Sequence, residues 1–222
     1  MLHDKYATSP NHYIRAYELI QKDLLNLFDY IEPSNTNLKT YSFRIHELLL
    51  RICVEVEANC KAILTENGYS KPGNWTVADY SKIEKSHNLS SYLVKLPVWK
   101  GTANMVSPFS AWATPSQPLG WYQSYNKTKH DRLTEFEQAN FKNLIDAICG
   151  LVVILAAQFW THNFSAGPML LSMGTIQNDG MESAIGDYFR IKFPDNWLSA
   201  DLYDFDWEQL KNDPNPFDMF SY

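Results

Sequence analysis

The hydrophobic pattern is most concentrated between residues 147 and 157, where no residue is polar. A helix that is apolar on every side must be enclosed by other elements. A membrane-spanning helix needs about 20 apolar residues, and Asp146 and Gln158 bound this run after 11. The segment therefore predicts a buried central helix within a helical bundle, ending near His162-Asn163, and no contact with a membrane.

Two amphipathic helices are predicted before this segment. Apolar residues recur every three or four positions from Tyr13 to Ile31, after Ser9-Pro10, whose serine and proline favour a helix start. The same spacing from Ile45 to Ile63 predicts a second helix over residues 38–65.

The segment between the helices has a different pattern. Thr76 and Asp79 have capping-box spacing, which predicts a short helix ending near His87-Asn88. Apolar residues then alternate over 91–96, and again over 188–193, which predicts two strands that pair as a small antiparallel appendage. Residues 97–120 hold four prolines and read as a long loop, so an insertion is expected over 88–120.

Charge is distributed unevenly along the chain. The formal net charge is −6, and the segment from Asp195 onward carries seven acids and one lysine, so the preceding residues are neutral. We expect one domain over 1–194 and an acidic, aromatic tail over 195–222 packed on it. The tail is either a solvated end anchored by its aromatic residues or a cover for a basic site.

The cysteines favour a reducing compartment. Cys53 and Cys60 are seven residues apart on a predicted helix, beyond the reach of a disulfide, and Cys149 lies in the apolar run. We expect three buried free thiols and a cytoplasmic protein. No Cys/His spacing resembles a zinc site, so neither a metal nor another cofactor is expected.

The candidate chemistry lies immediately before the apolar helix, in the sequence WYQSYNKTKHDR. Cationic side chains would hold phosphate oxygens and favour the neutral form of His130, which can act as a base. The spacing of Thr134 and Glu137 predicts that the long helix starts near Leu133. The basic residues would then lie in the turn before it or in a short helix broken at Asp131, in either case near a helix N-terminus, which favours anions. The alternative is a surface histidine in a charged turn. The predicted phosphate-binding residues are Lys127, Lys129 and Arg132.

A stripe of alternating charge follows the second helix at spacings of three and four residues. It is either a solvated face with weak ion pairs or a polar seam that faces the basic segment and supports it. Its members are Arg44, Glu47, Arg51 and Glu55.

Two long helices, the second containing ELLLRICVEVE, followed by YNKTKHDR before an apolar helix, resemble the HEPN superfamily, most closely an uncharacterised bacterial branch of it. The resemblance covers about 40–65 and 121–160. It implies a small helical bundle that dimerises, and RNA or a nucleotide as ligand. Many members are metal-independent RNases of toxin–antitoxin, abortive-infection or other defence systems, which implies a cognate antitoxin or defence partner; others are catalytically silent modules.

The family signature is an arginine, four to six residues, and a histidine, often with a polar residue after the arginine. Here His130 fits the histidine and Asn126 the polar position, whereas Tyr125 occupies the place of the arginine. The resemblance therefore implies catalysis by His130 with Asn126 positioning it. Lys82 and His87 have the same spacing with lysine for arginine and form an alternative pair.

Overall fold

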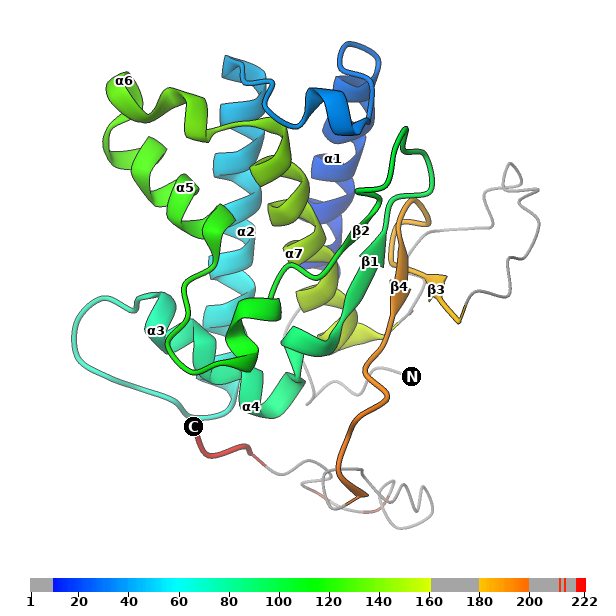
Figure 1. Ribbon diagram of the computed structural model, residues 1–222. Coiled ribbons are helices and arrows are strands. Elements are labelled where there is room, and N and C mark those ends of the chain that lie inside the picture. Colours follow the sequence, from blue (N-terminus) through cyan, green and yellow to red (C-terminus); the bar gives the residue numbers. More distant parts are fainter. Residues whose placement is uncertain (1–9, 161–179, 200–211, 213, 215–218) are drawn as a thin grey trace.

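A computed structural model describes residues 10–160, 180–199, 212, 214 and 219–222. The described chain is mainly helical, with a small antiparallel sheet of four strands beside the helices (Figure 1). The helices are α1 (Pro10–Phe28), α2 (Phe43–Glu66), α3 (Val77–Tyr80), α4 (Glu84–His87), α5 (Gly120–His130), α6 (Arg132–Glu135) and α7 (Phe141–Phe159). The strands are β1 (Leu93–Lys95), β2 (Met105–Val106), β3 (Glu182–Ser183) and β4 (Arg190–Lys192).

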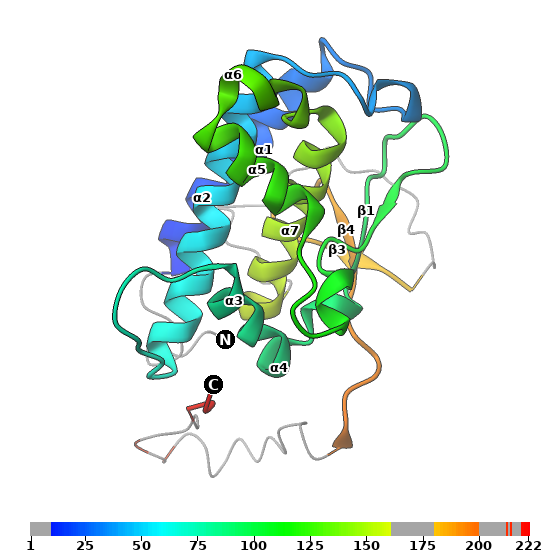
Figure 2. The ribbon, with the colours of Figure 1, turned by 60° about the vertical axis from the view of Figure 1, so that its left-hand side comes forward.

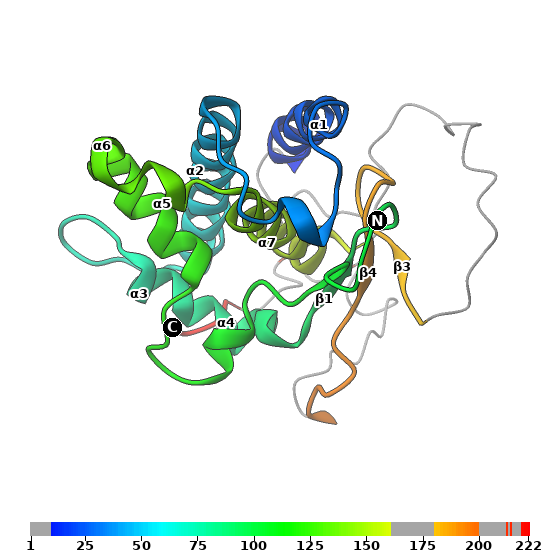
Figure 3. The same ribbon diagram turned by 45° about the horizontal axis from the view of Figure 1, so that its top comes forward.

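Helix α7 is buried along nearly its whole length, as its apolar sequence predicts. It packs against α2, α5, α1 and strand β1, and Figure 3 shows it running between other helices and the sheet. Its length and composition would allow it to cross a membrane, but 72% of its most apolar window is buried inside the described structure. That burial is typical of a helix in a protein core.

The start of α7 differs from the prediction. The helix begins at Phe141, where the Asn140 side chain accepts a hydrogen bond from the backbone N–H of Asn143 at 3.1 Å. Residues 132–138 form the short helix α6 and a 3-10 turn instead, and Asp131 caps α6 by accepting from Thr134 N–H at 3.2 Å. The predicted start near Leu133 was therefore wrong, because Asp131 and Asn140 supply the caps.

The first two helices follow their sequence signals closely. Helix α1 begins at Pro10, as predicted, but ends at Phe28, before Ile31, the last residue of the predicted apolar pattern. Helix α2 begins at Phe43 and is capped by Ser42, whose side chain accepts a hydrogen bond from Ile45 N–H at 3.2 Å. The predicted first residues of this helix, from 38 onward, form a turn instead.

The predicted pairing of two strands is confirmed, but the sheet has four strands and not two. Strands β1 and β4 pair antiparallel with Val94 opposite Ile191, and both side chains are fully buried. The strand order is β2-β1-β4-β3, so the predicted two-stranded appendage has an extra strand at each edge. Strand β2 lies within the predicted insertion 88–120, which is therefore not simply a loop.

Candidate functional site

Helix α5 carries most of the predicted site residues and ends at His130, with Asp131 as its C-cap. Of the two predicted placements, the structure therefore has the helix broken at Asp131 and not a turn before α7. The inner face of α5 buries Trp121, Tyr125 and Thr128. Its other face lines a cleft of about 780 Å³ against α2 and the loop before α3, here called the α2–α5 cleft. Figure 2 shows α2, α3 and α5 on one side of the molecule. The cleft is lined by Glu57, Lys61, Thr65, Gly73, Asn74, Trp75, Thr76, Val77, Tyr80, Tyr122, Asn126, Lys129 and His130.

Three of the five predicted residues near His130 meet in this cleft. Asn126, Lys129 and His130 line it, whereas Lys127, in the same turn of α5, is exposed and does not. The guanidinium of Arg132 lies on α6, 5.5 Å from the ring centroid of Phe43, and is also outside the cleft.

The predicted position of these residues near a helix N-terminus was wrong. Lys127, Lys129 and His130 occupy the last turn of α5. Cationic side chains at a helix C-terminus interact favourably with the helix dipole, so they stabilise α5. Any attraction of the cleft for an anion must therefore come from side-chain charge.

A polar network fixes the floor of the cleft. The Tyr122 hydroxyl donates to Glu57 Oε1 at 2.9 Å, and Lys129 Nζ donates to the Tyr125 hydroxyl at 3.0 Å. Burial, followed by the negative charge of Glu57, raises the pKa of both tyrosines well above its usual range. Both hydroxyls therefore stay protonated at neutral pH. The carboxylate of Glu57 and the ammonium group of Lys129 both line the cleft.

Tyr125, which stands where the signature that the sequence resembles has an arginine, is a buried residue of α5. Its side chain is 1% exposed and packs into the core, so the residue does not line the cleft. Lys61 of α2 lines the cleft opposite α5 and adds a second ammonium group. The cations of the cleft thus come from two helices.

Most residues that line the cleft were not predicted as site residues, and those among them with charged or large aromatic side chains include Glu57, Lys61, Trp75 and Tyr122. Glu57 and Lys61 are four residues apart and share a face of α2, a spacing visible in the sequence. Tyr122 and Asn126 have the same spacing on α5. The signal was therefore present within each helix, but nothing in the sequence showed that the two faces oppose each other.

Asp79 holds the outer wall of the cleft in place. Its carboxylate accepts from Lys71 Nζ at 2.6 Å, from Thr76 N–H at 2.6 Å and from the Tyr69 hydroxyl at 2.8 Å. Burial alone would raise the pKa of Asp79, but these hydrogen bonds outweigh it and hold that pKa far below its usual range. Trp75 packs edge-on against Tyr69, with centroids 5.3 Å apart, so the same carboxylate orders the aromatic wall.

The charged stripe on α2 does not face the cleft. Arg44 and Glu47 form an exposed ion pair at 3.0 Å. Arg51 pairs with Asp23 of α1. Burial raises the pKa of Glu55, and the positive charges of His12 and Arg51 oppose this rise only in part. None of these stripe residues lines the cleft. Arg44 and Glu47 lie on a solvated face, whereas Glu55 is partly buried.

The alternative pair, Lys82 and His87, also lies outside the cleft. Lys82 Nζ is 5.3 Å from the ring centroid of Tyr69, and His87 Nδ1 shares a 2.7 Å hydrogen bond with Ser86 Oγ. Burial lowers the pKa of His87 to about 4. This histidine stays neutral and serves the packing around α4.

The tail lies mainly outside the described residues. Where it is described, Asn196 bonds to Asn88 at 2.8 Å, and Phe220 N–H donates to Asn67 Oδ1 at 2.8 Å. The Tyr222 hydroxyl contacts Ser86 Oγ at 2.6 Å. These contacts anchor parts of the tail on the body, and no described tail residue lines the cleft.

Cys53, Cys60 and Cys149 are free and buried, as expected, and burial raises the pKa of each thiol. Within the described ranges, no group of three or more His, Cys, Asp or Glu side chains could hold a metal ion. The side chains that line the cleft supply two amides, a carboxylate, an imidazole, two ammonium groups, hydroxyl groups and aromatic rings.

Neither a family model, nor a curated protein, nor a solved structure matches the chain.

Proposed function

We propose that this protein is a HEPN-like protein that binds RNA or nucleotide phosphates in the α2–α5 cleft. The observation that supports this most is the convergence of Lys61, Lys129 and His130 from two helices on one cleft beside Trp75. Ammonium groups bind phosphate oxygens, and an aromatic side chain offers a surface on which a base can stack. A single-stranded ligand suits this combination, because its bases are free to stack.

The fold is compatible with this proposal. We infer that α1, α2, α5 and α7 make a helical bundle around α7, as in the HEPN superfamily that the sequence resembles. Free buried thiols favour a cytoplasmic location. By the same resemblance, the biological setting would be a bacterial defence or stress system with a cognate partner.

The cleft also holds the groups that metal-independent RNA cleavage requires. A base takes the proton of the 2′-hydroxyl, the 2′-oxygen attacks phosphorus, and the 5′-oxygen leaves with a proton from an acid. Glu57 and His130 are a carboxylate and an imidazole that line the same cleft, and Lys61 and Lys129 would stabilise the charge on the phosphate. We propose Glu57 as the base, His130 as the acid and Asn126 as the residue that positions it.

A second candidate function is a catalytically silent module that binds RNA, a nucleotide or a partner. The burial of Tyr125 favours it, because the position that would carry the family arginine contributes no charge to the cleft. The two candidates share the ligand site and differ in turnover.

Phosphate binding is tested by the salt dependence of RNA affinity. Lys61→Ala and Lys129→Ala should each weaken binding of a short single-stranded RNA and lower the slope of log K against log salt by about 0.7. Lys127→Ala is the matched control, because this lysine lies on the same helix turn as Lys129 but outside the cleft. Equal losses in all three variants would mean that general surface charge binds the RNA and would refute the cleft as the site.

We also propose that the protein forms a dimer through an apolar patch around α6, made of Tyr41, Phe43, Leu133 and Phe136. Leu133 is 93% exposed and Phe43 is 65% exposed, and the patch follows the last turn of α5 directly, so a second copy seated there would bring two clefts together. Leu133→Lys should convert the dimer to a monomer in sedimentation velocity. Leu19→Lys, which alters a leucine 52% exposed on α1, should leave the dimer intact. A monomeric wild type, or a dimer that persists in Leu133→Lys, would disprove this interface.

A further inference from the structure

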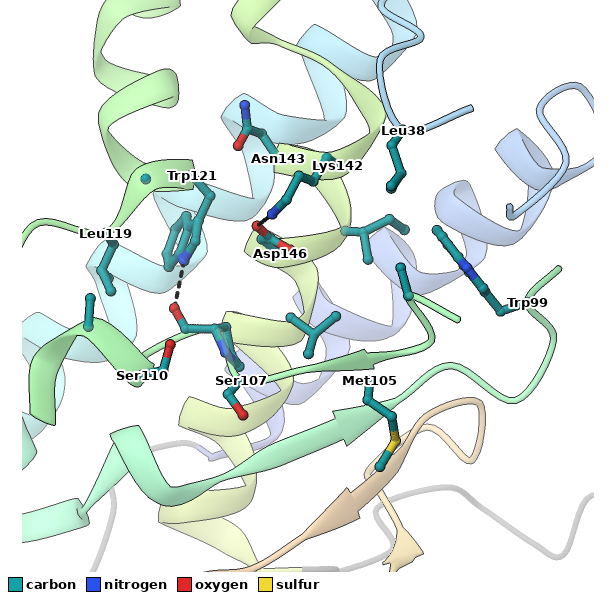
Figure 4. A pocket seen from close by; sticks show the side chains of 16 residues that line it. Leu38, Trp99, Met105, Ser107, Ser110, Leu119, Trp121, Lys142, Asn143 and Asp146 are labelled. Atoms are coloured by element: carbon teal, nitrogen blue, oxygen red, sulfur yellow. Dashed lines mark hydrogen bonds and ion pairs between the residues drawn. The ribbon is translucent and has the colours of Figure 1, made fainter. Parts of the chain in front are cut away.

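A second cavity, of about 450 Å³, lies where the segment 99–121 passes over α7 (Figure 4). It shares no lining residue with the α2–α5 cleft. Its walls are mostly apolar and include Leu38, Trp99, Val106 and Ile145. A cavity of this size with apolar walls and few polar groups is typical of a small-molecule site.

The polar side chains that line this cavity are Ser107, Ser110, Asn143 and one ion pair. Lys142 Nζ donates to Asp146 Oδ2 across one turn of α7, and Figure 4 shows the pair between Trp121 and Leu38. The Asp146 side chain is only 18% exposed, whereas Lys142 is 59% exposed. Burial raises the pKa of Asp146, and Lys142 opposes that shift. The pair therefore places a carboxylate within an apolar enclosure, with an ammonium group beside it.

Each member of the pair keeps unused hydrogen-bonding capacity. In the part of the chain that the structure describes, the only side-chain partner of Asp146 is Lys142, and that of Lys142 is Asp146. Asp146 Oδ1 can accept a further hydrogen bond, and the ammonium group has two more protons to donate. The indole N–H of Trp121 is not available, because it donates to the Pro108 carbonyl at 2.9 Å. The cavity thus offers an acceptor next to a donor.

We propose that this cavity binds a small heterocycle with a lactam edge, such as an oxopurine or oxopyrimidine. The ring N–H would donate to Asp146 Oδ1, and the neighbouring carbonyl oxygen would accept from Lys142 Nζ. Hydrogen bonds to ionised groups are about twice as strong as neutral ones, so this edge would orient the ligand. The apolar side chains of Leu38, Trp99 and Ile145 would cover its flat faces.

The site is independent of the α2–α5 cleft and of whether RNA binds there. A neutral ligand suits it better than a charged one, because the ion pair is already balanced. An anion would approach the buried carboxylate, and a cation would have to displace Lys142.

The test is calorimetric titration of the full chain with inosine and with 1-methylinosine, in which a methyl group replaces the ring N–H. Inosine should bind saturably, and 1-methylinosine at least tenfold more weakly. Asp146→Asn should weaken inosine binding at least tenfold, and Lys127→Ala, which alters an exposed lysine outside both cavities, should not change it. Circular dichroism and a thermal unfolding curve identify any variant that fails to fold. If Asp146→Asn does not fold, Lys142→Met gives a second measurement, because it removes the ammonium donor at a side chain that is 59% exposed.

Three results would overturn the proposal: no saturable inosine binding, equal affinity for the methylated probe, or unchanged affinity in both folded Asp146→Asn and Lys142→Met. Loss of inosine binding in Lys129→Ala but not in Asp146→Asn would place the ligand in the α2–α5 cleft. That outcome would also refute this site, while supporting the function proposed above.

Discussion

His130→Ala is expected to lower RNA cleavage by at least about a hundredfold, the smaller end of the range for loss of general acid–base catalysis. The reason is that the leaving 5′-oxygen would lose its proton donor, while Lys61 and Lys129 would still hold the phosphates. RNA affinity should therefore change much less than the rate. The measurement is cleavage of a labelled single-stranded RNA by purified protein with a chelator present, together with the affinity of the same RNA.

Two further variants make this experiment specific. Glu57→Gln keeps an oxygen that can accept from Tyr122 but removes the base, so it should also lose cleavage. His12→Ala, on the exposed surface of α1, is the control for a general effect of losing a histidine. Equal cleavage by wild type and His130→Ala would exclude the proposed acid. RNA binding without any cleavage by wild type would instead support the catalytically silent module.

The same cleft shows why the site could be predicted only in part. The sequence pointed to His130, Asn126 and Lys129 because they cluster within one short segment. It also pointed to Lys127, which lies in the same turn of α5 but outside the cleft, because neighbouring positions in a sequence do not show which side of a helix a residue occupies. Once α5 is known to be a helix, the spacing of Tyr122 and Asn126 selects the face that lines the cleft.

The contribution of α2 was harder to see. Glu57 and Lys61 lie in a helix whose apolar residues dominate the pattern, and they meet α5 only through tertiary packing. The more regular charge pattern on α2, which begins with Arg44, suggested a supporting polar seam, but Arg44 and Glu47 are exposed. Charge periodicity identifies a face of a helix without saying what that face contacts.

The fold was predictable where the signals are local. Pro10 and the Thr76–Asp79 spacing placed helix starts correctly, because a cap acts within a few residues. The pairing of β1 with β4 followed from alternation in both segments. Strands β2 and β3 have two residues each, too few for a pattern, and depend on their neighbours for register.

The start of α7 shows how two local signals can compete. Thr134 and Glu137 have capping-box spacing, but the Asp131 side chain takes the N–H of Thr134 and begins α6 there. Asn140 then provides a separate cap for α7. The sequence therefore offers two caps within ten residues, and α7 begins at the second of them.

Asp79 connects the stability of the fold to the shape of the cleft. Asp79→Ala should lower the free energy of unfolding by about 2 kcal/mol, as expected when hydrogen-bond donors lose a buried acceptor. The side chain is 5% exposed, so Lys71, the Thr76 N–H and the Tyr69 hydroxyl would together lose their acceptor. The loss is measured by urea unfolding at neutral pH.

The pH dependence follows from the direction of the pKa shift. The pKa of Asp79 is held below its unfolded value of about 3.9, so its stabilisation is present above that value and is lost as pH falls below it. Wild type should therefore lose stability between about pH 4 and pH 2 more steeply than Asp79→Ala. Asp79→Asn, which keeps the shape but not the charge, should resemble alanine in this pH range; parallel curves for all three proteins would contradict the role of the charge.

Asp79→Ala should also weaken RNA binding, although Asp79 itself does not line the cleft. The carboxylate holds Thr76 and, through Tyr69, the ring of Trp75, and both Thr76 and Trp75 line the cleft wall. Because the cations on α2 and α5 are unaffected, the salt slope should stay at its wild-type value while the affinity falls. Trp75→Ala should reproduce the weaker binding with a smaller loss of stability. A folded Asp79→Ala protein with full RNA affinity would show that the wall formed by the loop before α3 takes no part in binding.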